Sequence, residues 1–304
     1  MTVELRHLRY FVAVAEELHF GRAAQRLGIV QPALSKQIVA LERELGVRLF
    51  VRSKRSVSIT EAGQALHSEA RDILQRVDHA TDSAKLTDSG ALGSLAIGFI
   101  GPAMWNILPA LMREHRSRVP RMHFRLYEMT SGPMLQQVRD GILDAGFIRP
   151  FGHDEALEIR TVWSEPFAIA MVENHPLARH DVVDLADAAN ETFVLVSREG
   201  SPGLFDQCLA LCQNYGFSPL AIQEGNTGGA MFGMVAAGLG VTLVPASADL
   251  VPWPGVVFRP LTKSDPELAL AVAFRRDNNS TALSSFLETL DAVVEEMAVA
   301  SRSA

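Results

Sequence analysis

Cysteine is nearly absent from this chain of 304 residues, which contains only Cys208 and Cys212. Two thiols cannot build a disulfide framework, so we expect a fold without disulfides in a reducing compartment. Long apolar runs are missing as well, because no stretch approaches the roughly 18 residues of a membrane-spanning helix. The charged first residues also lack the apolar segment of a signal peptide. These absences predict a cytoplasmic protein with no membrane partner.

Sequence patterns that are typical of enzymes are missing too. There is no Gly-x-Ser-x-Gly elbow, no phosphate-binding P-loop, no His-Glu-x-x-His and no complete dinucleotide-binding glycine fingerprint. The nine histidines lack metal-ligand spacing. Cys208 and Cys212 could face one metal from a helix, but no third ligand accompanies them, and plain buried thiols are commoner. We therefore expect no catalytic residue, no metal and no cofactor.

Positive charge outweighs negative charge in the first sixty residues but not in the remainder of the chain taken as a whole. Residues 1–60 contain ten Lys/Arg and five Asp/Glu, a net of +5, whereas the remainder has a net of −12, and the two give the total of −7. A basic head on an acidic body fits a module that binds a polyanion. Chance variation in a solvated surface explains the charge alone equally well, so the prediction depends on the helices of this head.

Three short helices are predicted in the head, over residues 4–17, 21–28 and 31–45. Apolar residues recur at helical spacing in each, and Gly28 and Gly46 stand where left-handed stops are needed. Proline is favourable in a first helical turn, as at Pro32. The third helix buries its leucines and exposes polar residues near its start. Two helices joined by a tight turn, the second with a polar start, indicate a helix-turn-helix whose Gln31, Ser35 and Lys36 reach DNA.

A basic hairpin follows the third helix. Residues 47–60 alternate apolar and polar side chains around a tip that contains Arg52, Lys54 and Arg55. Such a wing suits the phosphate backbone or the minor groove. The alternative is a generic three-helix domain with a solvated charge cluster. Because the helix spacing, the Gln-Pro start and the wing occur together in order, the sequence favours DNA binding.

At these residues the chain resembles the LysR-type transcriptional regulators. The resemblance is carried by Leu5-Arg-His-Leu-Arg-Tyr-Phe, Gln31-Pro-Ala-Leu-Ser-Lys-Gln-Ile and Thr60-Glu-Ala-Gly63. It implies base-edge contacts from Gln31, Pro32 and Lys36, and backbone contacts from Ser35, Arg52 and Arg55. The chain departs from the family at Val30, often a serine there, and the missing side-chain cap costs about 1 kcal/mol of helix stability.

A long helix is predicted over residues 61–88, capped by Thr60. Six of its residues form a heptad seam for a partner helix: Leu66, Ala70, Ile73, Val77, Ala80 and Ala84. The alternative is a single helix that packs on its own domain. The resemblance implies a linker helix that pairs two subunits, in a homodimer or homotetramer. Residues 88–93 then break the helix and indicate a hinge.

Strands and helices alternate from residue 94 onward, a pattern typical of α/β folds with parallel sheets. Strands are predicted at residues 95–100, 123–128, 145–148, 167–172, 193–196, 220–224, 241–244 and 268–274. Helices are predicted at residues 104–116, 133–140, 204–215 and 230–237, with a last helix from about residue 281.

Small and hydroxyl residues stand between several of these strands and the helices that follow. They are Gly101, Pro102, Thr130, Ser131, Ser201, Pro202, Gly203, Asn226 and Thr227. Free N–H groups of helix starts that face one another across a cleft would bind an anion, and Arg149 could add a charge for a carboxylate. Ordinary turn chemistry accounts for each position singly. Their recurrence at many strand ends favours a cleft for a small organic acid.

The second region also resembles LysR-type effector domains, on Gly141-Ile-Leu-Asp-Ala-Gly146, His175-Pro-Leu-Ala178 and Val235-Ala-Ala-Gly-Leu-Gly-Val-Thr-Leu-Val-Pro245. This implies an effector domain over residues 93–304 with two α/β subdomains of the periplasmic-binding-protein type, namely 93–163 with 266–304, and 164–265. The resemblance is strongest to the branch that senses aromatic-degradation intermediates such as muconates and benzoates. The chain departs from that branch at Gly101-Pro102, where hydroxyl residues would hold the carboxylate.

The predicted architecture is therefore an N-terminal winged helix-turn-helix (residues 1–60), a linker helix (61–88) and a two-subdomain α/β effector domain. It predicts a transcriptional regulator that binds double-stranded promoter DNA and a small organic acid, with RNA polymerase as a further partner. The rival hypotheses are an enzyme acting on an organic acid and a solute-binding module without transcriptional action. The missing enzyme motifs oppose the first, and the basic head opposes the second.

Overall fold

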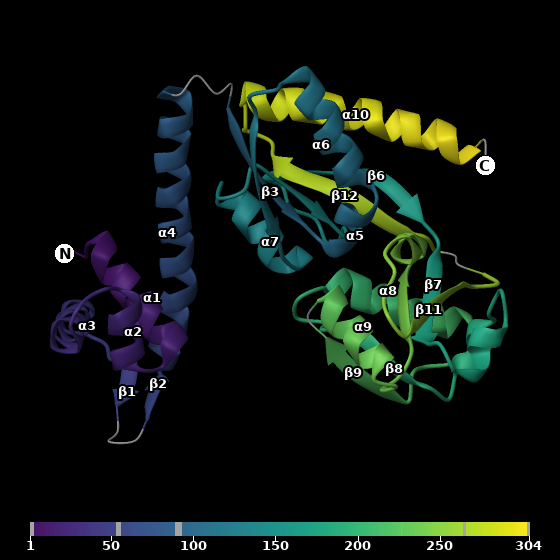
Figure 1. Ribbon diagram of the computed structural model, residues 1–304, viewed down its shortest axis with the longest axis horizontal. Helices are drawn as coiled ribbons and strands as arrows, with labels where there is room; N and C mark the ends of the chain where they lie inside the picture. Colours follow the sequence, from purple (N-terminus) through teal and green to yellow (C-terminus); the bar gives the residue numbers. More distant parts are fainter. Residues whose placement is uncertain (1–2, 53–55, 89–92, 226, 264–265, 303–304) are drawn as a thin grey trace. The chain divides into compact units, whose positions relative to one another are not determined.

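The computed structural model describes residues 3–52, 56–88, 93–225, 227–263 and 266–302 (Figure 1). The chain divides into two compact units, Met1–Lys85 and Leu86–Ala304, each with hydrophobic cores of its own. Among the described helices, none combines the length and the apolar character that crossing a bilayer would require.

The first unit contains three short helices, a hairpin and one long helix. These are α1 (Leu5–Glu17), α2 (Phe20–Arg26), α3 (Gln31–Leu45), β1 (Phe50–Arg52), β2 (Val57–Ile59) and α4 (Glu61–Asp88). The apolar helix faces meet in one core, where Phe11, Leu34 and Ile38 are fully buried. Gly28 and Gly46 follow α2 and α3 with φ of 67° and 71°, which confirms the predicted left-handed stops.

The predicted wing is confirmed as an antiparallel hairpin. Phe50 of β1 pairs with Ile59 of β2, and Arg52 pairs with Val57. A fully buried Leu49 and Phe50 tie the base of the hairpin to the helical core. The tip, which includes the predicted phosphate-binding residues Lys54 and Arg55, lies outside the described residues.

Helix α4 begins as predicted, because the Thr60 hydroxyl accepts a hydrogen bond from the Gly63 N–H at 2.9 Å. The first residues of its heptad seam pack in the core of the unit, and Ile73 is exposed to solvent. Ala70 is fully buried in the unit's own core and Leu66 packs against that core, whereas Ile73 is 43% exposed. Packing on its own domain therefore explains the first part of the seam, and a partner helix remains a prediction for the part from Ile73 onward. Residues 89–92 of the predicted hinge lie outside the described residues.

The second unit begins with a five-stranded sheet of order β4-β3-β5-β12-β6. Its elements are β3 (Ser94–Phe99), α5 (Gly101–Trp105), α6 (Ile107–Arg118), β4 (His123–Glu128), α7 (Ser131–Arg139), β5 (Ala145–Ile148), β6 (Leu157–Glu165), β12 (Leu268–Arg275) and α10 (Thr281–Arg302). Strands β4 and β5 run parallel to β3, but β12 is antiparallel to β5 and β6. The predicted parallel pairing is confirmed for β3, β4 and β5, and the antiparallel β12 and β6 extend this sheet.

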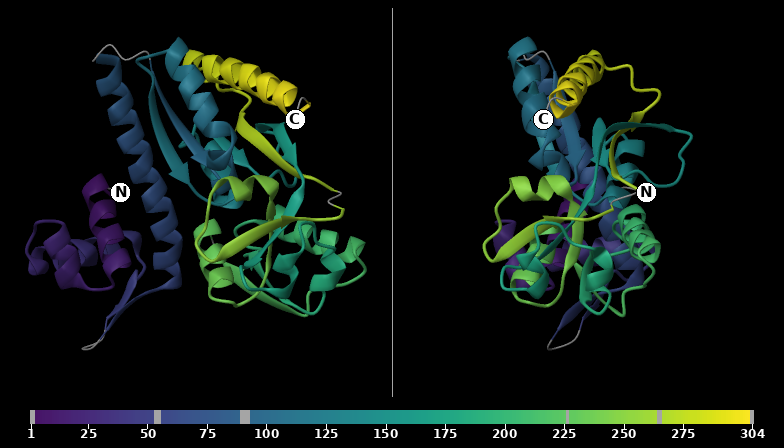
Figure 2. Two further views of the ribbon diagram at one scale, coloured as in Figure 1. Left: turned by 45° about the vertical axis from the view of Figure 1, so that its right-hand side comes forward. Right: turned by 90° about the vertical axis from the view of Figure 1, so that its right-hand side faces the viewer.

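Helices cover both faces of this sheet. A side chain at Gly98 or Gly146 would meet Met134 of α7 at 2.8 Å, so these two glycines let α7 pack closely on one face. The next residue, Phe147, points to the opposite face, where its ring lies 6.4 Å from that of Phe286 in α10. Helix α10 packs beside α6 on that face (Figure 2).

A second sheet forms from residues 167–260. In chain order, the strands, α-helices and 3-10 helices (η) of this part are β7 (Phe167–Val172), η1 (Pro176–Arg179), η2 (Leu185–Ala188), β8 (Thr192–Val196), α8 (Pro202–Asn214), β9 (Ala221–Gly225), α9 (Gly228–Ala236), β10 (Thr242–Pro245), η3 (Ala246–Leu250) and β11 (Val256–Pro260). Strand β7 pairs antiparallel with β10 and β11, and β8 pairs parallel with β9. A bridge between Phe193 and Val241 joins the two groups. Phe193 faces the core with α8, and Val194 faces the core with α9.

Three elements differ from the sequence-based expectation. Strands β6 and β11 were not predicted, and the helix expected over residues 104–116 is two helices. The break lies at Asn106, whose side-chain oxygen accepts from the Ile107 N–H and so caps α6. This break turns α5 away from α6 and leaves Trp105 as the last residue of a separate short helix.

Candidate nucleic-acid interface and ligand cavity

Helix α3 of the first unit presents a polar, exposed N-terminal end. Gln31, Pro32 and Lys36 are exposed, and Ser35 is half-buried. The opposite face of the same helix is buried, so the side chains predicted to contact DNA project from the domain. Lys36 forms no ion pair within the described part of the chain. An unpaired cation on an exposed helix start can meet a phosphate or a base edge without first losing an internal partner.

Arg52 of the wing has internal partners that the sequence did not reveal. Its guanidinium pairs with Glu42 of α3 at 3.0 Å and donates to the Ser35 hydroxyl at 3.3 Å. It also lies over the Phe20 ring, 4.6 Å from the centroid. These contacts tie the wing to α3. Arg52 thus fixes the relative position of the two predicted DNA-binding elements within the first unit.

Glu42 extends this connection to the base of the wing. Its second carboxylate oxygen accepts hydrogen bonds from the N–H groups of Leu49 and Phe50 at 2.9 and 3.1 Å. Charge-assisted hydrogen bonds of this kind are about twice as strong as neutral ones. One carboxylate therefore orders both the start of β1 and the Arg52 guanidinium.

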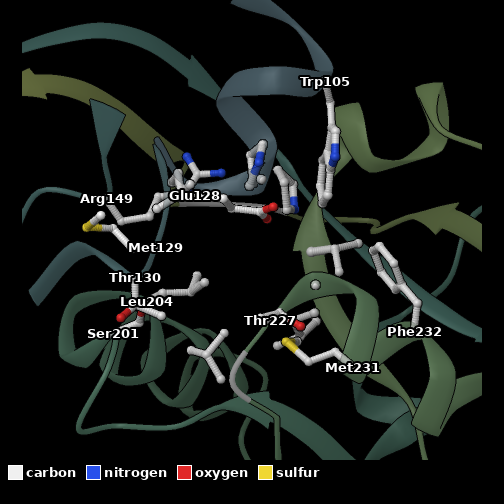
Figure 3. A pocket seen from close by; sticks show the side chains of 18 residues that line it. Trp105, Glu128, Met129, Thr130, Arg149, Ser201, Leu204, Thr227, Met231 and Phe232 are labelled. Carbon is white, nitrogen blue, oxygen red and sulfur yellow. The ribbon is translucent and has the colours of Figure 1, made fainter. Parts of the chain in front are cut away.

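A cavity of about 210 Å³ lies in the second unit, among residues of both sheets and of the helices α5, α8 and α9 (Figure 3). Its described lining is Ile100, Gly101, Pro102, Trp105, Glu128, Met129, Thr130, Arg149, Val196, Ser201, Leu204, Thr227, Gly228, Met231, Phe232, Leu243, Val244 and Pro245. A cavity of about 150 Å³ admits benzene, so this one has room for a single ring with small substituents.

Six of the predicted effector residues line the cavity, namely Gly101, Pro102, Thr130, Arg149, Ser201 and Thr227. Three others lie beside it without lining it. The hydroxyl of buried Ser131 accepts from the Arg149 N–H, Pro202 opens α8, and Gly203 lies close to Phe151. The remaining one, Asn226, lies outside the described residues.

Two of the lining hydroxyls are available to a ligand. Thr130 and Ser201 stand at the N-caps of α7 and α8, and neither side chain makes a capping hydrogen bond. Within the described residues, neither hydroxyl has any other hydrogen-bond partner. Thr227 differs, because its hydroxyl already caps α9 by accepting from the Ala230 N–H at 3.2 Å. An acceptor group of a ligand would therefore meet the Thr130 and Ser201 side of the cavity.

Arg149 lies where the chain crosses between the two sheets. Its guanidinium is 2% exposed, faces Glu165 at 3.7 Å and donates to the Leu268 carbonyl at 3.2 Å. Glu165 ends β6, and its other oxygen accepts from the Ser247 N–H at 2.8 Å. Burial lowers the pKa of Arg149 to about 10, although the Glu165 carboxylate opposes this change. Arg149 stays charged at neutral pH, and Glu165 compensates its charge.

Sequence reasoning missed the apolar and acidic walls of the cavity. Trp105 and Phe232 stand 6.0 Å apart between ring centroids, and Phe232 also contacts Trp253 at 5.5 Å. Glu128, the last residue of β4, adds an exposed carboxylate. The signal that could have found Trp105 is a bulky aromatic residue three positions after the Gly101-Pro102 turn that leads from β3 into α5. No local signal marks Glu128, because the direction of its side chain depends on the residue at which β4 ends.

The two cysteines are buried, as predicted. Cys208 and Cys212 lie on α8 in the core of the second sheet, each 1% exposed and free. Burial raises the pKa of the Cys212 thiol to about 12 and also raises that of Cys208. Protonated, inaccessible thiols are poor nucleophiles and poor metal ligands, so both cysteines act as core residues.

Comparison with known protein families gives two matches that together span most of the chain. Residues 5–64 match the bacterial regulatory helix-turn-helix protein, lysR family, and residues 88–295 match the LysR substrate binding domain. The transcriptional regulator AlsR of Bacillus subtilis is 36% identical over 285 residues, which cover 94% of both chains.

Solved structures agree with these matches. The chain resembles CbnR, a LysR family transcriptional regulator, alone and in complex with its target DNA, with TM-scores of 0.80 and 0.78 at 27% identity over 96% of this chain and 99% of CbnR. It also resembles the effector binding domain of BenM with its effector benzoate, with a TM-score of 0.60 at 27% identity over 67% of this chain and 93% of that domain. The chain therefore belongs to the LysR family and is a helix-turn-helix transcriptional regulator with an effector-binding domain.

Proposed function

We propose that this regulator binds promoter DNA in the cytoplasm as a homodimer or homotetramer, and that a small organic acid in the cavity changes how it bends that DNA. The observation that carries the proposal is one chain with both an exposed polar start of α3 and a ligand-sized cavity. We further propose that the protein acts by binding alone and catalyses no reaction.

In the first unit, Gln31, Pro32 and Lys36 read base edges in the major groove, and Ser35 contacts the backbone. The exposure of the first three residues and the structure of CbnR with its target DNA support this assignment. Arg52 supports the interface by holding the wing against α3. A partner helix along α4 from Ile73 onward would place two such heads on successive grooves.

In the second unit, the acid group of the effector binds at the Thr130 and Ser201 hydroxyls. Their free hydrogen-bonding capacity supports this, as does the binding of benzoate by the BenM effector domain. An aromatic ring would then lie against Trp105 and Phe232. A ligand that touches both sheets stabilises one relative orientation of the two subdomains, and this shifts the equilibrium between conformations.

The test measures DNA binding and bending by the full chain, with duplexes selected from a random pool. Lys36→Ala should weaken binding about tenfold, because a base or phosphate contact is lost, whereas Lys263→Ala, an exposed lysine of the second unit, should leave it unchanged. Saturating benzoate or muconate should alter the footprint or bend of the wild type. It should have no effect on a Thr130→Ala, Ser201→Ala double variant. A footprint that no organic acid changes would disprove the proposed coupling.

A further inference from the structure

The charged groups of the cavity differ in how well they are compensated. Of the described lining residues, only Arg149 and Glu128 carry a formal charge. Arg149 is almost fully buried and faces the carboxylate of Glu165 at 3.7 Å. Glu128 is exposed and has no hydrogen bond or ion pair with any described residue. The charge that lacks an opposite charge beside it is therefore negative, while the buried Nε and Nη2 of Arg149 are paired with Glu165 by charge and have no hydrogen-bond partner among the described residues.

Glu128 is directed into the cavity. Its side chain runs along the cavity with the carboxylate toward Trp105 (Figure 3). Gly101 leaves this corner open, because a side chain there would lie 3.2 Å from the Trp105 ring and 3.6 Å from the Glu128 Oε1. A ligand group in this corner thus meets an indole face and a carboxylate oxygen together.

The free hydroxyls lie elsewhere on the wall. Thr130 and Ser201 project from the starts of α7 and α8, on the side of the cavity away from Trp105 in Figure 3. The cavity thus offers hydrogen-bond donors on one side and a carboxylate acceptor on the other, with apolar residues such as Leu204, Met231 and Phe232 between and around them. A ligand that fills the cavity must present a hydrogen-bond acceptor to the hydroxyls and a hydrogen-bond donor to the carboxylate.

A ligand without a donor would pay a desolvation penalty at Glu128. An ionised carboxylate that loses water without gaining a hydrogen bond is strongly disfavoured, and a second carboxylate nearby would also repel it. An amino or hydroxyl group removes this penalty by donating to the carboxylate. Hydrogen bonds to a charged group contribute more to affinity than those between neutral groups.

We infer that the effector is an amino- or hydroxyl-substituted aromatic acid, whose acid group binds at Thr130 and Ser201 and whose donor group binds Glu128. This inference rests on the proposed function, since it refines the chemical class of the same effector. Glu128 is then the residue that selects among related acids.

The experiment compares benzoate with 3- and 4-hydroxybenzoate and 3- and 4-aminobenzoate by isothermal titration calorimetry on the full chain. At least one substituted acid should bind about tenfold more tightly than benzoate. In Glu128→Gln this ratio should fall toward one, while benzoate binds as well as before or better, because the uncompensated charge is gone. Glu173→Gln, an exposed carboxylate outside the cavity, should keep the wild-type ratio.

Each other result has a defined meaning. Equal binding of benzoate and all four derivatives, a ratio that Glu128→Gln leaves intact, or no binding of any of the five acids would overturn the inference. If benzoate alone binds and changes the DNA footprint, the proposed function stands and the inference fails. If a substituted acid binds through Glu128 but leaves the footprint unchanged, the inference stands and the proposed coupling fails.

Discussion

The predicted DNA-binding surface and the ligand cavity are built in opposite ways. The surface comes from one helix, α3, and the hairpin that directly follows it, so its residues are neighbours in the sequence as well as in space. The cavity takes its lining from segments between Ile100 and Pro245, which include strand ends of both sheets and parts of α5, α8 and α9. A local surface tolerates changes in the rest of the fold, whereas a distributed cavity depends on how two subdomains are joined.

The largest expected effect concerns the buried pair of Arg149 and Glu165, which lies where the two sheets are joined. Glu165→Gln removes the compensating charge of buried Arg149, and breaking a buried pair in this way costs about 3–5 kcal/mol. All three tryptophans, Trp105, Trp163 and Trp253, lie in the second unit, so urea unfolding followed by their fluorescence reports on that unit. Glu158→Gln, which breaks the exposed pair with Arg276, serves as the control and should change little. Equal midpoints for the two variants would contradict the assigned role.

A second prediction concerns Arg52, which the sequence assigns to a phosphate contact. Arg52→Ala should weaken binding to all duplexes alike, by about tenfold, because the wing loses its attachment to α3. A direct phosphate contact would reduce the log–log salt slope by about one unit. We expect a smaller change, since Glu42 already neutralises the guanidinium. Band-shift titrations at several salt concentrations measure both quantities, and a change of a full unit in the slope would favour a direct phosphate contact by Arg52 over the positioning role.

A gain of stability is expected at Val30. This residue is the N-cap of α3, is 69% exposed and provides no side-chain hydrogen bond. Val30→Ser supplies the missing acceptor and should stabilise the helix start by about 1 kcal/mol. Slower hydrogen exchange of the Ala33 amide would show it, because the N2 residue is Pro32 and has no N–H. Val39→Ser, an exposed position inside the same helix, should give no such protection, and protection in both variants would argue against capping.

The smallest effect is confined to acid pH. Burial lowers the pKa of His115, which packs against Phe124 and Phe286 and hydrogen-bonds the Thr289 hydroxyl at 2.9 Å. Below the ordinary pKa of 6.5 the unfolded chain takes up a proton that the folded chain resists, so stability falls as the pH drops through this range.

His115→Gln should flatten this acid dependence in tryptophan-detected urea unfolding between pH 7 and 5. The absolute stability of this variant is not the readout, because a buried hydrogen bond is lost as well. His123→Gln, at an exposed position, should keep the wild-type pH dependence. An unchanged slope in the His115 variant would remove this residue from the acid response.

The difference between the two regions also explains what the sequence could predict. In the first unit, helix spacing, Gly28, Gly46 and the Gln31-Pro32 start are local signals, and the structure confirms the elements that they predict. Arg52 shows the limit of this reasoning. Its position in the wing follows from the sequence, but its partner Glu42 lies ten residues earlier on another element.

In the second unit, turn chemistry located Thr130, Ser201 and Thr227, because helix starts leave a local pattern. The direction of β12 and the pairing of β6 leave none, since strand order and polarity depend on distant partners. For the same reason the sequence places Arg149 beside the cavity but does not reveal its partner Glu165, which ends the unpredicted strand β6.

The contacts of Arg149 also restrict how the two halves of the effector domain can move. Its backbone belongs to the loop after β5, and its side chain reaches both crossing segments, at Glu165 and Leu268. A rotation about an axis through this point leaves those short contacts almost unchanged, whereas sliding one half past the other would separate buried opposite charges. We therefore expect the domain to open and close by pivoting, so that a small displacement near the axis becomes a larger one at the far rim.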